Sequence, residues 1–194
     1  MALKVNETRK PQAVTYFALN NRVNIPVNGM IPLEKDREAV RAYFLEHVNP
    51  NTVFFYNLDE KIKYLIENDY IEEDFIRLYD IEFVQNLFQY LYDKKFRFRS
   101  FLGAFKFYNQ YAMKTRDGER YLERYEDRIA LMSLYLAQGD ENLAKSIADE
   151  HIDHRLQMAT PTFLNAGKRA RGELVSCFLV DIQDNMESIG RTVN

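Results

Sequence analysis

The spacing of hydrophobic residues predicts a mostly helical chain over roughly the first 155 positions. Apolar side chains recur there at three- and four-residue steps, which is the period of one helix face. The expected helices cover 33–47, a segment after 59, 72–79, a segment through 83–91, 96–113, 119–138 and a segment after 140. Before them, residues 14–19 are compatible with a short strand or a helical turn.

Several residues mark the ends of these helices. Pro32 suits the first turn of the helix at 33–47, because its missing N–H needs no partner there. Pro50 and its flanking asparagines stop that helix. Gly139 is placed to terminate the helix at 119–138, and Asp140 to cap the next one.

The pattern changes after Met158, where turn-forming residues and a charged loop replace the helical period. They lead into Leu174–Val180, an apolar run interrupted only by the small Ser176 and Cys177. Such a run is typical of a strand buried on both faces, as in a parallel sheet or an α/β barrel. The sequence therefore predicts a strand here, followed by the start of a helix near 184–189.

A doubly buried strand needs parallel neighbours, and no earlier segment has the pattern of one. We therefore expect residues 1 to about 155 to form a self-contained helical unit. Residues 159–194 are expected to open a second domain, the rest of which lies outside this sequence.

Composition and charge narrow the possible classes of function. The net charge is −3, and basic residues alternate with acidic ones, so no surface for nucleic acid or an anionic membrane is expected. No apolar run approaches the roughly 20 residues that span a bilayer. The amino terminus lacks the basic and apolar order of a secretory signal. A single cysteine excludes an intramolecular disulfide framework, so the expected location is cytoplasmic.

Few residues are candidates for chemistry. Cys177 could be a redox thiol or a nucleophile, although a lone cysteine in an apolar run is more often a small buried hydrophobe. The histidines at 47, 151 and 154 lack the further ligands that a metal site requires, so none is expected. A solvated helix end explains His151 and His154 better. No glycine-rich phosphate-binding motif is present.

Five blocks in the second half of the chain have a recognisable order and spacing. They are Lys114-Thr115, Leu122–Arg128, Ala159–Gly167, Arg171–Leu179 and Asp184–Gly190. Together they resemble the large (alpha) subunit of class Ib ribonucleoside-diphosphate reductases, which are ribonucleotide reductases. The segment 101–108 also fits, and the resemblance covers essentially the whole chain.

The resemblance implies a fold. The family has a helical amino-terminal region followed by a ten-stranded α/β barrel, so the implied class is mainly α, with a helical amino-terminal domain followed by the first strand of a truncated barrel. The implied domains are a shortened, cone-like helical region at 1–85, an all-helical domain at 86–158 and the start of the catalytic barrel at 159–194. The shortened cone argues against control of activity by a nucleotide there.

The resemblance also implies an activity and partners. The family reduces ribonucleoside diphosphates to 2′-deoxyribonucleoside diphosphates for DNA synthesis by a thiyl-radical mechanism. A small subunit with a dimetal–tyrosyl radical starts the reaction, nucleoside triphosphates act as effectors, and a thioredoxin- or glutaredoxin-like protein is the reductant. This chain is expected to bind no cofactor itself, and to need a complementary carboxy-terminal fragment. The complete subunit is expected to be a homodimer.

Four residues inherit roles from the matching blocks. Cys177 corresponds to one of two reducing thiols, and Thr160, Ser176 and Cys177 to substrate contacts. Asp184 corresponds to a position in the allosteric effector site, although a helix cap would also explain it. The radical-bearing cysteine and the second reducing thiol are expected beyond Asn194. One thiol cannot form an intramolecular disulfide, so we expect no reductase activity from these 194 residues alone.

Two alternatives of a different class remain open. One is a non-catalytic helical module that binds a partner or a nucleotide and retains the start of a barrel. The other is a compact helical protein in which Cys177 is structural. Reconstitution of activity with a complementary fragment would separate both from the enzyme.

Overall fold

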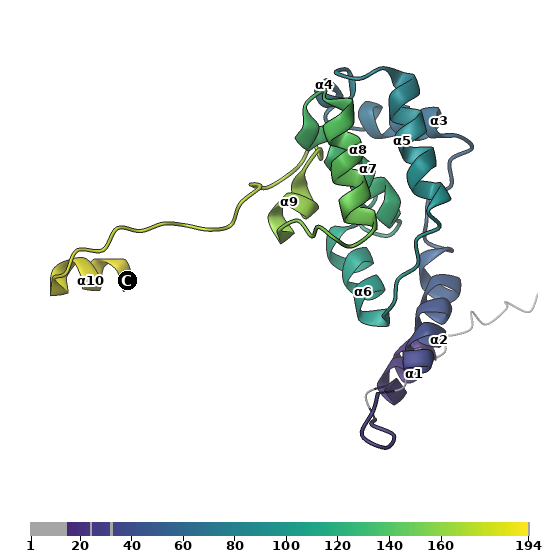
Figure 1. Cartoon of the computed structure of the whole chain (residues 1–194), viewed down its shortest axis with the longest axis horizontal. Helices are drawn as coiled ribbons and strands as arrows, with labels where there is room; N and C mark the ends of the chain where they lie inside the picture. The colour runs from purple at the N-terminus through teal and green to yellow at the C-terminus, as the bar shows by residue number, and fades with distance from the viewer. Residues whose placement is uncertain (1–14, 24, 32, 194) are drawn as a thin grey trace, which may run out of the picture.

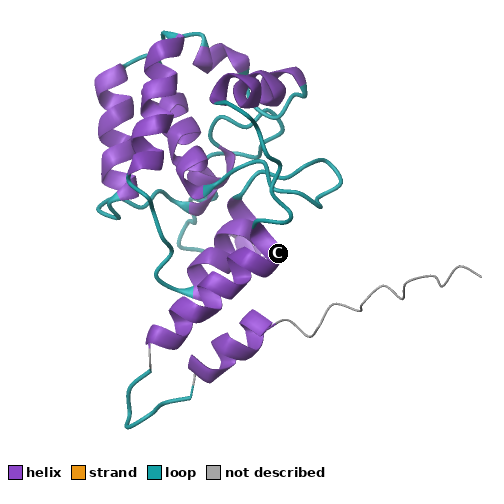
Figure 2. Cartoon of the chain, turned by 90° about the vertical axis from the view of Figure 1, so that its right-hand side faces the viewer, coloured by secondary structure: helices purple, strands orange, loops and turns teal. Residues whose placement is uncertain are grey.

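The computed structural model describes residues 15–23, 25–31 and 33–193, and the regular secondary structure over these ranges is all helical, joined by loops (Figure 2). The described residues form ten α-helices, two π-helical turns and no strand. The α-helices are α1 (Thr15–Val23), α2 (Leu33–Tyr43), α3 (Leu58–Glu67), α4 (Glu73–Ile76), α5 (Ile81–Asp93), α6 (Phe101–Lys106), α7 (Tyr125–Ala137), α8 (Glu141–Ile152), α9 (Thr160–Asn165) and α10 (Met186–Val193). The π-helical turns are η1 (Phe44–Val48) and η2 (Phe107–Tyr111).

Helices α3 to α9 form the main body of the molecule. Helix α7 lies at its centre and packs against α4, α5, α8 and α9. Its residues Ile129, Leu131, Met132 and Leu134 are all completely buried. From Ile129 onward α7 is apolar on nearly every side, and such a helix belongs inside a protein because no face of it gains from contact with water. The other helices of the main body therefore surround α7 (Figure 1).

Helices α1 and α2 form an antiparallel pair at one end of the molecule (Figures 1 and 2). They meet the main body through α6, where the rings of Tyr16, Tyr43 and Phe101 lie within 5.6 Å of one another. The helical alternative for this region is thus confirmed over α1. The prediction for 33–47 is also confirmed, as α2 continued by η1. Val14 and Pro32 lie outside the described residues.

The prediction of a helix at 119–138 is wrong at its start, since α7 begins only at Tyr125. The preceding residues are extended: Leu122 N–H donates to Met113 O at 2.8 Å, and Tyr121 N–H donates to Asn51 O at 2.7 Å. These distant partners satisfy the backbone groups that a helix would otherwise pair locally. The stretch at 96–113 is likewise helical only from Phe101, after a Ser100 cap.

The predicted strand at Leu174–Val180 is not formed. Residues 175–183 run as an exposed, extended chain away from the main body and end in α10 (Figure 1). Phe178 and Leu179 are 91% and 101% exposed. The physical reason is that no other strand exists among the described residues to pair with this one. The helix expected near 184–189 is confirmed as α10.

Residues 160–165 require a further correction, since the sequence indicated turns and the structure has α9. Pro161 stands in its first turn, where proline is well tolerated.

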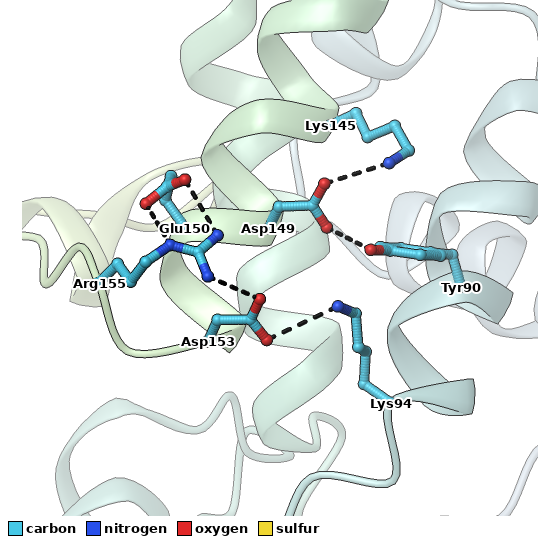
Figure 3. Close-up of polar contacts among 7 residues, drawn as sticks. All are labelled: Tyr90, Lys94, Lys145, Asp149, Glu150, Asp153 and Arg155. Carbon is cyan, nitrogen blue, oxygen red and sulfur yellow. Dashed lines mark hydrogen bonds and ion pairs between the residues drawn. The ribbon is translucent and has the colours of Figure 1, made fainter.

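A polar network fastens the end of α5 to α8 on the surface (Figure 3). The Tyr90 hydroxyl donates to Asp149 at 2.5 Å, and Lys145 pairs with the same carboxylate at 3.1 Å. Asp153 pairs with Lys94 at 3.6 Å. Each of these solvated contacts contributes little alone, but together they orient the two helices.

Candidate functional site

Side chains of α9 hold the segment that follows it. Thr162 Oγ1 donates to Leu174 O at 3.0 Å, and Asn165 Nδ2 donates to Glu173 O at 2.9 Å. The Asn165 Oδ1 also accepts a hydrogen bond from Gly172 N–H at 3.3 Å. The chain therefore folds back along α9 as far as Leu174 and leaves the main body there. These three hydrogen bonds fix the position at which it leaves.

The residues predicted for the site all lie along this part of the chain. Thr160 is the first residue of α9, and its hydroxyl oxygen lies 3.2 Å from that of Tyr111. Ser176 and Cys177 are exposed on the extended segment, and Asp184 is exposed just before α10. Among the described residues, no hydrogen bond or ion pair joins any two of these four. The structure thus places Thr160 on the helix whose Thr162 and Asn165 hold the start of the segment that carries Cys177, and Cys177 itself is exposed.

A buried arginine connects α7 to the end of α9. Arg128 is completely buried, donates to the carbonyl oxygen of Ala166, and lies 3.2 Å from Glu123. Burial lowers the pKa of Arg128, and the nearby Glu123 opposes that effect. Glu123 is also completely buried and accepts the Met113 N–H at 2.8 Å. Sequence periodicity gave no sign of this pair, because charged residues at a helix start usually face water.

Asp127 forms a second buried polar centre one residue away. It accepts hydrogen bonds from Lys61 of α3 and Tyr92 of α5, and from the Arg124 N–H at 2.6 Å. Burial raises the pKa of Tyr92, and the Asp127 charge adds to the effect. The block Leu122–Arg128 therefore acts as a polar hub, which links α3, α5, the end of α9 and the backbone at Met113 to the start of α7.

Backbone contacts also fix residues 166–169, which follow α9 and are called the α9 exit below. Glu72 N–H donates to Gly167 O at 3.2 Å, and Arg169 N–H donates to Tyr70 O at 3.0 Å. Gly167 has a φ of +77°, and a Cβ there would lie 3.1 Å from a Phe75 ring carbon. The chain reverses at this point in a space that suits only glycine.

Lys168 makes a further contact beside the exit. Its Nζ donates to Tyr111 O at 2.7 Å, and burial lowers the pKa of Lys168 to about 8. The lysine thus joins η2 to the residues that follow α9.

His151 is completely buried, so the prediction of a solvated helix end is wrong for it. Its ring stacks on Phe163 of α9 with centroids 4.8 Å apart, and burial lowers its pKa to about 4. The ring is therefore neutral near pH 7 and serves as packing.

No group of three or more metal-ligating side chains occurs in the described part of the chain. None of the helices described is long and apolar enough to span a membrane.

A cavity of about 1350 Å³ lies between the α2–η1 helix, the loop at 49–57, the start of α3, α5, the segment at 96–99 and the start of α7. Its lining includes five arginines: Arg37, Arg41, Arg97, Arg99 and Arg124. Phe54 and Tyr56 also line it, 74% and 86% exposed, with ring centroids 5.5 Å apart. Cationic groups beside open aromatic rings suit a ligand with an anionic part and a planar part. Sequence reasoning missed this cavity because its arginines come from separate segments.

Comparison with known proteins identifies the class to which this architecture belongs. Residues 16–96 match the family model described as "Ribonucleotide reductase N-terminal", and residues 97–171 match "Ribonucleotide reductase, all-alpha domain". The chain is 49% identical over 183 residues, or 94% of its length, to the ribonucleoside-diphosphate reductase subunit alpha of Bacillus subtilis. It is also 49% identical over 158 residues, or 81% of the chain, to the subunit alpha of Mycoplasma pneumoniae.

The chain belongs to the family of class Ib ribonucleotide reductase large subunits and matches their amino-terminal region. It spans 26% of the length of the Bacillus subtilis relative and 22% of the Mycoplasma pneumoniae relative. The mainly helical fold agrees with the all-alpha description of the second family model.

Proposed function

We propose that this chain is the amino-terminal part of an enzyme that reduces ribonucleoside diphosphates to 2′-deoxyribonucleoside diphosphates by a thiyl-radical mechanism. The observation that carries the proposal is the exposed apolar segment with the only thiol, anchored at its base to α9. Large apolar side chains at such high exposure indicate a surface that packs against further polypeptide. In the proposed enzyme, that polypeptide supplies the remaining strands of the barrel.

The proposed chemistry assigns a role to each site residue. The Cys177 thiol gives a proton to the departing 2′-hydroxyl, which leaves as water. Cys177 and a second thiol outside this chain then supply two electrons and become a disulfide. Thr160 and Ser176 hold the substrate, and Asp184 belongs to the effector site.

The proposal includes the partners of the family. A radical-bearing small subunit starts each turnover, and a thioredoxin- or glutaredoxin-like protein reduces the disulfide afterwards. We also propose a cytoplasmic homodimer for the complete subunit, with the domains divided near residues 85 and 158.

Reconstitution tests the proposal. We expect no deoxynucleotide product from the purified chain supplied with small subunit, effector and reductant, because it has one thiol. Adding a polypeptide that corresponds to the rest of the Bacillus subtilis relative should give product, measured by chromatography of a labelled ribonucleoside diphosphate. The intact relative is the positive control. Product from the chain alone, or none when both folded pieces are combined, would contradict the proposal.

The cavity of about 1350 Å³ favours a second candidate function, the binding of a nucleotide by the helical region. Its arginines can pair with phosphate, and the exposed rings of Phe54 and Tyr56 can stack on a base. This function does not need Cys177, so it also suits a non-catalytic module.

Calorimetric titration of the chain with ATP tests the second candidate. We expect one site, with affinity reduced about tenfold or more in Arg37→Gln/Arg41→Gln, because a charge-assisted hydrogen bond contributes about 1.5–3 kcal/mol. The matched control is Lys63→Gln/Arg77→Gln, which removes the same charge from exposed positions outside the cavity. Equal losses in both variants, or no binding by the parent chain, would exclude the site.

A further inference from the structure

Backbone hydrogen bonds and the side chains of Lys168 and Arg171 hold the residues after α9 to the helical body, and one further contact comes from a completely buried side chain. The hydrogen bond from Arg128 to Ala166 O comes from a side chain with no exposed surface. Ala166 is the C-cap residue that follows α9. The carbonyls at a helix end have no partner within the helix, so an external donor there fixes both the helix and the chain that leaves it.

The ion pair with Glu123 does not by itself explain this contact. A buried arginine needs a counter-charge, and Glu123 supplies one at 3.2 Å. The guanidinium has five N–H donors in a rigid fork, so it can hold Glu123 and reach another acceptor at the same time. A second N–H of the guanidinium donates to the carbonyl oxygen of Ala166, the residue before the tight reversal at Gly167.

The geometry points to Arg128 as a positioning residue, which sets α9 and the chain after it relative to the helical body. The effect extends to both predicted groups of substrate contacts, because Thr160 begins α9 and the segment with Ser176 and Cys177 departs from its side. The consequence for catalysis rests on the proposed function. The local anchoring does not.

The test must separate positioning from stability, since Arg128→Met alone leaves Glu123 buried without its partner. The double variant Glu123→Gln/Arg128→Met removes both charges together. The new amide side chain keeps an oxygen that can accept the Met113 N–H, and the new thioether side chain fills much of the space of the arginine. Replacing a buried pair by uncharged groups of similar volume is often tolerated. This variant should therefore fold while it lacks the donor to Ala166.

Hydrogen–deuterium exchange of the full chain measures the anchoring. In the double variant we expect the amides of Glu72 and Arg169, which bond across the α9 exit, to exchange at least about tenfold faster. The amides of α8 should keep their parent rates. The matched control is Arg171→Gln, which removes a partly exposed ion pair with Glu72 from the same segment and should change these rates less than about twofold. Unchanged exchange at the exit, or a uniform rise through α7 and α8, would overturn the inference.

Turnover in the reconstituted reductase measures the consequence. A displacement of about 1 Å costs roughly a hundredfold in rate, so kcat should fall by that order while the thermal midpoint shifts by only a few degrees. Full turnover despite faster exchange at the exit would refute a role of Arg128 in catalysis. If the parent enzyme shows no turnover, the proposed function fails, and the exchange experiment still decides whether Arg128 anchors α9.

Discussion

Replacement of Asp127 by alanine should lower the free energy of unfolding by about 3–5 kcal/mol, the usual cost of removing one partner from a buried ion pair. Asp127 is completely buried, and the Lys61 ammonium beside it is almost as inaccessible. Without the carboxylate, the lysine charge has no counter-charge and the Tyr92 hydroxyl loses its acceptor. The Arg124 N–H at the start of α7 also loses its cap. Urea denaturation followed by far-ultraviolet circular dichroism measures the change.

Two control variants show whether the loss of stability comes from the polar hub. Lys63→Gln breaks an exposed pair with Glu67 and should change stability by less than about 0.5 kcal/mol. Lys61→Met combined with Asp127→Asn removes both charges and should cost less than Asp127→Ala, since no charge remains buried alone. A loss below about 1 kcal/mol for Asp127→Ala would mean that Lys61 finds water easily, and the hub would then not be the centre of the fold.

The helices of the main body were predictable because a helix face is a local pattern. The apolar steps in α5 and in the second half of α7 mark the sides that pack together. The extended conformation of residues 119–124 was not predictable, because their backbone pairs with Met113 and with residues 51–53, which are distant in sequence. A local period cannot reveal such partners, so the predicted helix began too early.

The strand at Leu174–Val180 shows the opposite limit. The segment is apolar, as a buried strand must be. A strand forms only by hydrogen bonding to neighbouring strands, and the described residues provide none. The same holds for the site, since the resemblance indicated Cys177 while the residues around its substrate are contributed by other polypeptide in the proposed enzyme.

The polar hub shows why some buried charged residues escape sequence reasoning. Glu123, Asp127 and Arg128 look like ordinary charges at the start of a helix, where acidic residues are common. Their burial depends on α3, α5 and α9 closing over them, which is a tertiary property. Only the family resemblance singled out this block, and in the structure its side chains bond to α3, to α5 and to the residue after α9.

In the reconstituted reductase, Cys177→Ser should reduce dithiol-dependent turnover to the background level. A serine hydroxyl can still give a proton to a leaving group, but it cannot supply an electron or form a disulfide with a second thiol. The substitution exchanges one sulfur for one oxygen and changes the side chain little in size, and the thermal midpoint of the reconstituted enzyme checks that the variant folds. The measurement is product formed per active site over many turnovers, with dithiothreitol as reductant.

The neighbouring residue provides the control for this experiment. Ser176→Ala leaves the thiol in place and removes one hydrogen-bonding group, so turnover should fall by about tenfold at most. Equal losses in the two variants would indicate that the segment, rather than the sulfur, is what the reaction needs. Parent-level turnover in Cys177→Ser would leave the thiol without a chemical role. The function of the segment would then have to be the packing of its apolar side chains against the remainder of the subunit.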